Sequence, residues 1–251
     1  MGYVSWLGKY DTTESVLVTL LRKAGAVFYT KTSVPQTLMV CETVNNIIGR
    51  TLNPRNKNWS CGGSSGGEGA MVGIRGGVIG VGTDIDINAS GEPSIPNIKD
   101  LLNPDIQQID MNQLWDTHLK KWNYQSEYLE KWRELEEQQG KELDAIIAPI
   151  TATAAIRHNQ FRYYGYASVI NLLDFTSVVV PVTFADKNLD LKKKDYQPLG
   201  DLDATVQAEY DPEAYHGAPV AVQVIGRRLS EERTLAIAEE IGRLLGNSVT
   251  P

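Results

Sequence analysis

The sequence is poor in cysteine and has no long apolar run. Its two cysteines, Cys41 and Cys61, have neither the spacing of metal ligands nor the number needed for a disulfide framework. We therefore expect two free thiols and no metal site. No apolar run approaches the roughly 20 residues that cross a bilayer, and the N-terminus lacks a signal-peptide pattern. These absences predict a cytoplasmic protein without a membrane span.

Basic charge is also scarce. The chain of 251 residues carries 24 Lys and Arg against 31 Asp and Glu, a formal net charge of −7. Binding of nucleic-acid phosphates requires a clustered positive face. The basic run at 192–194 is bracketed by Asp190 and Asp195, which is typical of a solvated loop. We therefore predict no nucleic-acid partner. A chain of this length with 42% hydrophobic residues can form one sizeable domain with a core.

What the chain does have is a glycine–serine stretch at 61–70, Cys-Gly-Gly-Ser-Ser-Gly-Gly-Glu-Gly-Ala. Glycines allow the backbone to approach a ligand closely and to adopt angles that a Cβ forbids. Glu68 follows Ser65 by three residues, the spacing of a capping box, which predicts a helix start at this point. Free N–H groups at that start would point at the serines. An apolar, strand-like run follows at 78–85.

Helical and strand-like patterns alternate along the rest of the chain and predict an α/β layered domain. Helices are expected at 14–24 (capped by Thr12 or Thr13), at 112–139, at 166–173 and after Ser230. Strands are expected at 26–29, 143–149, 177–182 and 220–225. Pro181 restricts its strand to a sheet edge, an end or a bulge. We interpret the aromatic stripe of the 112–139 segment as packing, and the polar residues 186–212 as a surface excursion.

The glycine–serine stretch, together with Gly-Thr-Asp-Ile at 82–85, resembles the amidase signature family, and specifically the fungal acetamidase-type and general amidases. Residues 24–36, 144–149 and 217–226 resemble further segments of that family. The resemblance implies a mixed β-sheet core flanked by helices, here incomplete. It implies a single partial domain over 1–251, with an N-terminal block at 1–85 and a C-terminal block at 86–251. It also implies no cofactor and a small carboxamide as substrate, and it leaves the oligomeric state open.

Amidases of this family hydrolyse carboxamide C–N bonds with a Ser–Ser–Lys triad and an acyl-enzyme. A neutral lysine draws a proton, through a serine held by a cis peptide bond, from the nucleophilic serine. A hydroxyl is a poor nucleophile until a neighbouring base takes its proton. Lysine can serve as that base when its surroundings lower its pKa. By matching position, Ser64 is the bridging, cis-bonded serine of the charge relay.

The chain departs from the family directly after Thr-Asp-Ile. The family continues with Gly-Gly-Ser-Ile-Arg, whose serine is the nucleophile, whereas this chain places Asn88 at that position. An aspartate at position 86 brings negative charge to the place where an oxyanion must form. The expected substrate and oxyanion positions are Ile85, Asp86, Ile87 and Asn88. From Asp86 onward the chain resembles a segment that normally lies far downstream. We therefore expect a missing central block and a start beyond the triad lysine.

Other residues could replace the missing groups. Ser90 is the candidate substitute nucleophile, and Lys31 is the candidate substitute base. A Ser–His–Asp arrangement also stays open on paper, with His118, His158 and His216 as the available histidines. Two hypotheses follow: an amidase-type hydrolase with residual activity, or a catalytically inactive remnant or binding protein. We favour the inactive one. Loss of a central block also predicts unpaired sheet edges, exposed apolar faces and poor solubility.

Overall fold

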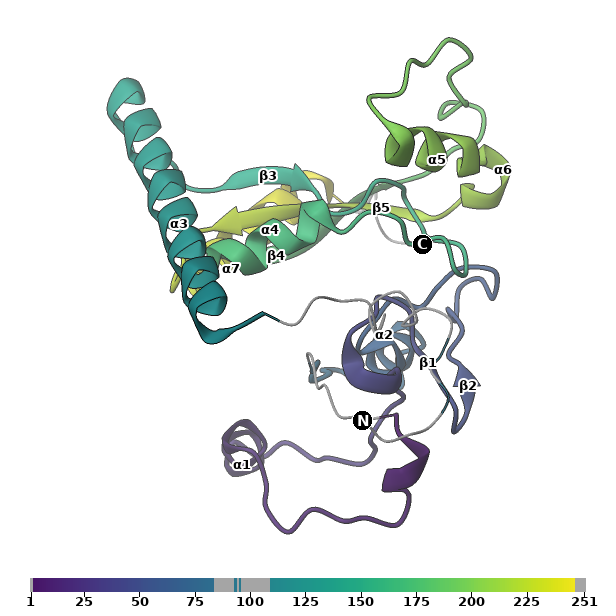
Figure 1. The fold of residues 1–251 in the computed structure, drawn as a ribbon. Helices are drawn as coiled ribbons and strands as arrows, with labels where there is room; N and C mark the ends of the chain where they lie inside the picture. Colours follow the sequence, from purple (N-terminus) through teal and green to yellow (C-terminus); the bar gives the residue numbers. More distant parts are fainter. Residues whose placement is uncertain (1, 84–92, 94, 96–108, 247–251) are drawn as a thin grey trace. The chain divides into compact units, whose positions relative to one another are not determined.

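The computed structural model describes residues 2–83, 93, 95 and 109–246 (Figure 1). The chain divides into two compact units. Unit 1 comprises Met1–Ile106 and Ile156–Phe161, and unit 2 comprises Gln107–Ala155 and Arg162–Pro251. The expectation of a single domain with blocks at 1–85 and 86–251 stays a prediction. No helix in the described ranges is long and apolar enough to cross a membrane.

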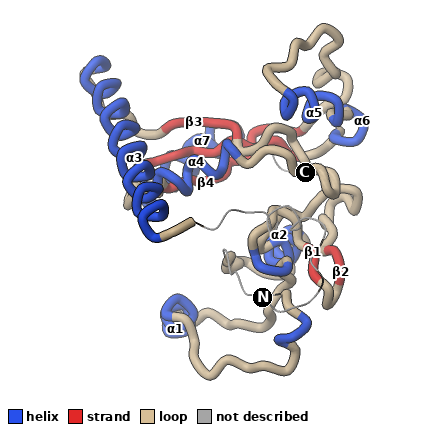
Figure 2. Tube along the Cα trace, in the orientation of Figure 1, coloured by secondary structure: helices blue, strands red, loops and turns tan. Residues whose placement is uncertain are grey.

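Unit 2 is built on a three-stranded antiparallel sheet, shown by the red strands of Figure 2. Its strands are β3 (Ile146–Pro149), β4 (Thr176–Phe184) and β5 (Pro219–Gly226), in the order β3-β5-β4. In the register, Ile147 lies opposite Val224, and Val180 lies opposite Val222. All three strands were expected from their apolar runs. The first begins three residues later than the predicted 143.

The prediction that Pro181 lies at a sheet edge, an end or a bulge is confirmed. β4 is an edge strand, and its pairing with β5 shifts register between Pro181 and Thr183. Proline has no N–H to donate to a neighbouring strand, so an edge with a local irregularity is where a sheet tolerates it. Along the same strand exposed side chains alternate with partly buried ones and with the buried Val180, because successive residues point to opposite faces.

The core of unit 2 lies between the sheet and α7 (Glu231–Leu244), which packs against β4 and β5 (Figure 1). Val180, Val224 and Ala238 are buried at its centre. Partly buried aliphatic side chains surround them: Ala145, Val178, Val182, Val222, Ile237 and Ile241. Val224 is fully buried (0% exposed). Ser230 precedes α7 as predicted, but its hydroxyl donates to the carbonyl of Arg227 instead of capping the helix.

Helix α3 (Met111–Gln139) confirms the long helix predicted at 112–139. Asp110 and Gln113 form a capping box at its start: the Asp110 carboxylate accepts from the Gln113 N–H at 2.8 Å, and the Asp110 N–H donates to the Gln113 side chain at 2.9 Å. Gly140 ends the helix in the left-handed conformation, with φ of 65°.

The aromatic stripe of α3 is only partly packed. Trp132 is 3% exposed, its indole N–H donates to Glu136 at 3.0 Å, and its ring meets Phe175 edge-on at 5.9 Å between centroids. Trp115 and Trp122 are 61% and 66% exposed. The packing interpretation is therefore right for Trp132 and wrong for the other two. α4 and Phe175 contact the helix at Gln125, Tyr128 and Trp132.

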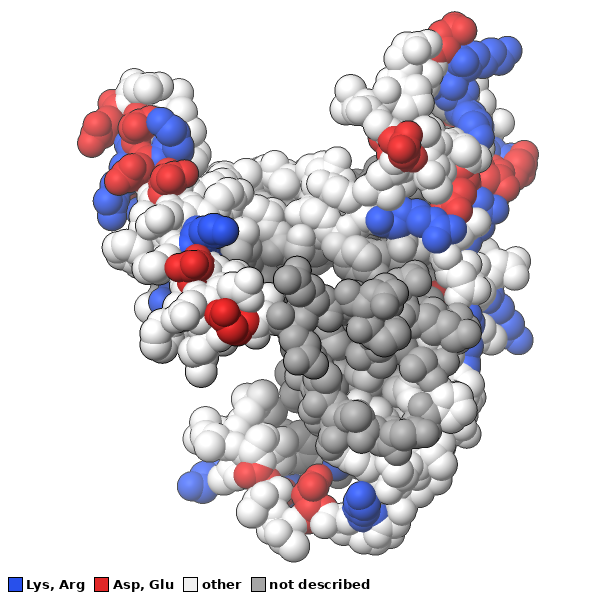
Figure 3. Space-filling view, viewed as in Figure 1, with Lys and Arg blue, Asp and Glu red and all other residues white. Residues whose placement is uncertain are grey.

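The remaining helices of unit 2 are α4 (Gly165–Leu173), α5 (Asp201–Glu209) and α6 (Pro212–Tyr215). α4 was predicted at 166–173, whereas 186–212 was expected only as a surface excursion and contains α5. Arg162 holds α5 through a two-pronged ion pair with Glu209, with N–O distances of 2.5 to 3.2 Å. On the face shown in Figure 3, basic and acidic side chains are interspersed over the α5–α6 region.

Unit 1 contains short elements joined by long loops. Its helices are η1 (Val4–Trp6), α1 (Val16–Lys23), η2 (Gln36–Leu38) and α2 (Gly66–Gly73), and its strands are β1 (Val44–Asn45) and β2 (Gly49–Arg50). The strands pair antiparallel. α1 is shorter than the predicted 14–24 and is capped by Ser15, whose hydroxyl accepts from the Val18 N–H, and not by Thr12 or Thr13.

Two strands predicted in unit 1 are wrong. Neither 26–29 nor 78–83, the described part of the 78–85 run, forms a strand. Val27 is 85% exposed and Val78 is 95% exposed, so both runs lie at the surface. An apolar run becomes a strand only where a neighbouring strand pairs with it, and the described backbone offers none here.

Candidate active site

Ser64 lies in unit 1, directly before α2. The Gly63–Ser64 peptide bond is cis, which is the geometry that the family resemblance implied at this position. The Ser64 hydroxyl donates a hydrogen bond to the backbone carbonyl of Thr83, with an O–O distance of 3.1 Å. Its role as the relay serine stays a prediction.

Ser65 also hydrogen-bonds to the backbone of Thr83. Its hydroxyl accepts from the Thr83 N–H at 2.8 Å and lies 3.3 Å from the Thr83 carbonyl oxygen. Both serines are therefore anchored on Thr83, 18 and 19 residues further along the chain. Thr83 opens the Thr-Asp-Ile segment, so the glycine–serine stretch and the start of that segment lie together. Sequence reasoning missed this role because a backbone carbonyl leaves no side-chain pattern.

The first N–H groups of α2 do not point freely at the serines, so this expectation is wrong. The Gly66 N–H donates to the Thr43 hydroxyl at 3.0 Å, and the Gly67 N–H donates to the Ser33 carbonyl at 3.0 Å. The Thr43 hydroxyl in turn donates to the Gly62 carbonyl at 3.0 Å. The donors that a helix start leaves unpaired are used here to pack the stretch against two other segments of unit 1.

The predicted capping box is also wrong. Ser65 is the N-cap residue of α2, but its side chain makes no capping hydrogen bond. Its hydroxyl is occupied by Thr83, and the Glu68 carboxylate is occupied by the Thr32 hydroxyl at 2.7 Å and the Val81 N–H at 3.2 Å. Partners from distant segments have taken the place of the local ones, and Glu68 thereby ties two loops to α2.

Close packing explains why glycine occupies the start of α2. A Cβ on Gly66 would collide with the Thr43 hydroxyl and with the Cys61 sulfur. A Cβ on Gly67 would collide with the backbone of Ser33. Both glycines are buried. The glycines of the stretch thus serve the close approach of protein segments to one another.

Neither Lys31 nor His158, the candidate bases of unit 1, is hydrogen-bonded to Ser64. Lys31 is exposed, so its ammonium group stays in water instead of being desolvated as a base lysine must be. Within the described residues, Ser64 forms no hydrogen bond with a lysine or histidine nitrogen. His118 and His216 belong to unit 2. His158 lies in unit 1 but is engaged elsewhere: Nδ1 lies 2.8 Å from a Glu42 oxygen and Nε2 lies 2.9 Å from the Lys57 carbonyl.

Glu42 is the centre of a second polar cluster, which sequence reasoning missed. Its side chain is 3% exposed and pairs with Arg50 as well as with His158. The backbone N–H of Asn159 donates to its other oxygen at 2.9 Å. Burial raises the pKa of Glu42, but these hydrogen bonds outweigh burial and hold the pKa below its ordinary value. The cluster attaches Ile156–Phe161 to the rest of unit 1.

The other predicted site residues cannot be placed. Ile85, Asp86, Ile87, Asn88 and Ser90 lie outside the described residues, so their roles stay predictions. Both cysteines are free thiols, as expected. Burial raises the pKa of Cys61, which favours the protonated thiol over the thiolate. In the part of the chain that the structure describes, no three His, Cys, Asp or Glu side chains are grouped to hold a metal ion.

Comparison with known proteins decides the family. The family model described as Amidase matches residues 1–86 and 93–235. The chain belongs to the amidase family. It is 51% identical to an acetamidase of Emericella nidulans, over all of this chain and 74% of the relative, and 45% identical to an acetamidase of Aspergillus oryzae, over 98% and 74%. A solved fatty acid amide hydrolase superposes with a TM-score of 0.79 at 20% identity, covering 98% of this chain and 70% of that one. This likeness confirms the amidase-signature fold, with mixed strands and helices.

The amidase matches also differ from this chain in length. The two acetamidase alignments run over 408 and 404 residues, whereas the chain has 251. The relatives therefore carry residues inside the matched region that have no counterpart here. The family match itself is interrupted between residues 86 and 93, directly after Thr-Asp-Ile. This is the point at which the sequence was expected to have lost a central block.

Proposed function

We propose that this amidase-family chain recognises a small carboxamide and does not hydrolyse it. The substrate class follows from the two acetamidases that match the chain along most of its length. The loss of turnover rests on the segment after Thr-Asp-Ile: the motif resemblance puts Asn88 in the place of the nucleophilic serine, and the family match is interrupted from residue 87 to residue 92. An amide side chain cannot form the acyl ester on which the family's two-step hydrolysis depends.

The geometry around Ser64 supports this proposal. A relay serine must receive a proton from the nucleophile and pass it to a base. In the described residues the Ser64 hydroxyl donates to the Thr83 carbonyl, which cannot serve as a base. Lys31 is exposed and His158 is held by Glu42 and the Lys57 carbonyl. Ser64 is therefore positioned, but the described partners do not complete a relay.

The residues next to Asn88 also argue against hydrolysis. By the same resemblance, Asp86 and Ile87 take the places of two glycines whose N–H groups help to form the oxyanion hole in the family. A carboxylate close to the developing oxyanion opposes it electrostatically. In serine hydrolases the removal of the nucleophile alone lowers kcat by about 10⁶. We therefore expect hydrolysis at background level.

Ammonia release from acetamide and benzamide tests the proposal. The purified chain is assayed beside the Emericella nidulans acetamidase, which serves as the positive control for acetamide. We expect no release above that of a heat-treated sample. If release is found, Ser90→Ala is compared with Ser5→Ala, an exposed serine outside the glycine–serine stretch. Turnover that disappears in Ser90→Ala and persists in Ser5→Ala would overturn the proposal and make Ser90 the nucleophile.

Binding is measured separately, because a chain without turnover can either retain or lose its ligand. Saturation-transfer NMR with acetamide and benzamide reports binding without requiring chemistry. We expect transfer to both amides. If neither amide binds, the recognition part of the proposal fails, and the chain is an amidase remnant without a ligand.

A further inference from the structure

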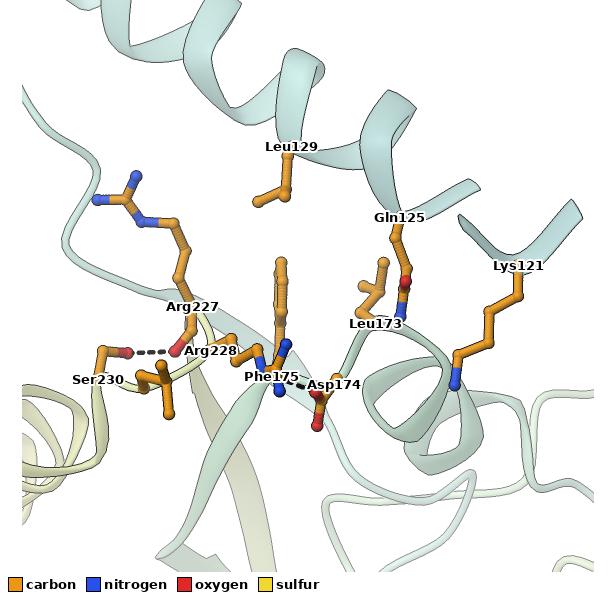
Figure 4. Close-up of a pocket in the computed structure, with 10 residues that line it drawn as sticks. Lys121, Gln125, Leu129, Leu173, Asp174, Phe175, Arg227, Arg228 and Ser230 are labelled. Atoms are coloured by element: carbon orange, nitrogen blue, oxygen red, sulfur yellow. Dashed lines mark hydrogen bonds and ion pairs between the residues drawn. The ribbon is translucent and has the colours of Figure 1, made fainter. Parts of the chain in front are cut away.

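Unit 2 contains a pocket of 670 Å³. It lies between α3, the turn from α4 to β4, and the turn from β5 to α7 (Figure 4). Every residue that lines it belongs to unit 2, whereas Ser64 belongs to unit 1. Sites for small organic ligands have volumes of about 300 to 1,000 Å³. The pocket therefore has the size of a ligand site of its own.

One wall of the pocket is apolar and well supported. Leu129 points from α3 toward Phe175 (Figure 4). The Phe175 ring is held by edge-on contacts with Tyr128 at 5.8 Å and with Trp132 at 5.9 Å between centroids. Leu173, also in the lining, is 4% exposed. An aromatic or aliphatic ligand body would bury its surface against side chains that are already fixed in place.

The charged groups of the lining are mostly cationic. They are Lys121, Arg227 and Arg228, against the single carboxylate of Asp174. Arg228 is neutralised by Asp174, with an N–O distance of 2.8 Å. The Arg227 guanidinium lies over the Trp132 ring, 5.8 Å from its centroid, and 4.0 Å from a Glu136 oxygen, whereas Lys121 forms no ion pair with any described residue. The pocket thus carries excess positive charge in a chain whose net charge is −7.

We propose that this pocket binds a small organic monocarboxylate. The ligand's apolar body lies against Leu129 and Phe175, and its carboxylate faces the charge of Lys121. A carboxylate matches this group because an ammonium group donates charge-assisted hydrogen bonds to it. The ligand class is an aryl or alkyl monocarboxylate.

Benzoate and benzamide form a matched pair of probes, since they share a ring and a size and differ in charge. Isothermal titration of the full chain measures both, at low and at high salt. We expect benzoate to bind with an affinity that falls as salt rises, because added salt screens the cations. Lys121→Gln should weaken benzoate binding by about fivefold, the scale of one exposed ion pair. Lys120→Gln, an exposed neighbour outside the lining, should leave it unchanged.

Both substitutions replace an exposed helical lysine by another good helix former, so α3 is retained. The proposal is overturned if benzoate does not bind, or if Lys121→Gln and Lys120→Gln affect its binding equally. Benzamide binding that Lys121→Gln leaves unchanged takes place at a different site and concerns only the proposed amide recognition. Benzamide binding that equals benzoate binding and falls equally in Lys121→Gln also overturns the proposal, because charge then plays no part.

Discussion

Replacement of Glu42 by glutamine tests how unit 1 holds a segment from the far half of the chain. Glu42 is 3% exposed and accepts from Arg50, from His158 at 2.8 Å and from the Asn159 N–H at 2.9 Å. Asn159 is 117 residues away in sequence. Glu42→Gln keeps the size of the side chain and removes its charge and one of its acceptors. The contact between Ile156–Phe161 and the rest of unit 1 should then open more often.

The expected cost is about 2 kcal/mol. Hydrogen bonds to charged groups contribute about 1.5 to 3 kcal/mol, and the loss of one member of a buried ion pair costs about 3 to 5 kcal/mol. The lower part of this range applies because Arg50 and His158 are partly exposed and regain water. At about 1.4 kcal/mol for each factor of ten, 2 kcal/mol corresponds to an opening equilibrium about 30 times more favourable.

Native-state hydrogen exchange measures this opening at single amides. The Asn159 N–H donates to Glu42, and the Ser60 N–H donates to the Ile156 carbonyl at 2.8 Å, so both should exchange about 30 times faster in Glu42→Gln. Glu137→Gln, at an exposed position of α3, is the control and should leave both rates unchanged. Equal exchange rates in Glu42→Gln and wild type would show that Glu42 does not hold Ile156–Phe161 in place.

The Glu42 cluster also makes the stability of unit 1 depend on pH. The pKa of Glu42 is lower in the folded chain than its ordinary value of 4.5. The unfolded state therefore takes up its proton first as the pH falls. The stabilisation is complete above pH 4.5 and is lost as the pH falls through the lower folded value. Protection of the Asn159 amide should accordingly decline in acid in the wild type and change little in Glu42→Gln.

Three further outcomes follow from the packing. In Gln223→Leu the backbone amides of β5 should exchange at least tenfold faster. The reason is that the buried side-chain amide of Gln223 donates to the carbonyls of Pro149 and Tyr166, both at 2.8 Å. Unchanged exchange rates would contradict this. In Gly66→Ala the collision with Thr43 should abolish protection of the Gly67 amide, whereas Gly69→Ala, which meets only an ordinary contact, should retain it. The purified chain should associate with rising concentration in light scattering, and a monodisperse monomer with a sharp thermal transition would argue against exposed apolar faces.

That last prediction rests on surfaces that the structure leaves uncovered. β3 and β4 are the edge strands of the described sheet of unit 2. Ile147 on β3 is 60% exposed, and Val179 on β4 is 49% exposed. Exposed strand edges and apolar side chains promote association between chains. The relatives carry additional residues inside the matched region, so the missing block and these open surfaces are consistent with each other.

Elements with local signals were predicted well from the sequence. The α3 segment carries its periodic apolar residues, an aspartate and a glutamine in capping-box spacing, and a terminal glycine, and all of these act within a few residues of one another. Pro181 likewise restricts its own backbone and its own strand. The amidase fold followed from motif resemblance, and the family match confirms it.

Features that depend on distant partners were missed or wrong. Ser65 and Glu68 have capping-box spacing, but Thr83, Thr32 and Val81 bind them instead. The run at 26–29 has strand-like residues and no strand to pair with. The Glu42 cluster joins residues more than a hundred positions apart, and such pairs leave no periodic pattern. Local propensity is decided in these places by tertiary contacts.

We propose that the chain keeps the amidase fold and the placement of Ser64 but has no activated serine nucleophile. Intact-mass measurement after exposure to a serine-directed fluorophosphonate tests this proposal, because an activated serine is captured covalently even when its turnover is slow. We predict no added mass under conditions that label the Emericella nidulans acetamidase fully. A stoichiometric adduct that peptide mapping places on Ser64 or Ser90 would contradict the claim.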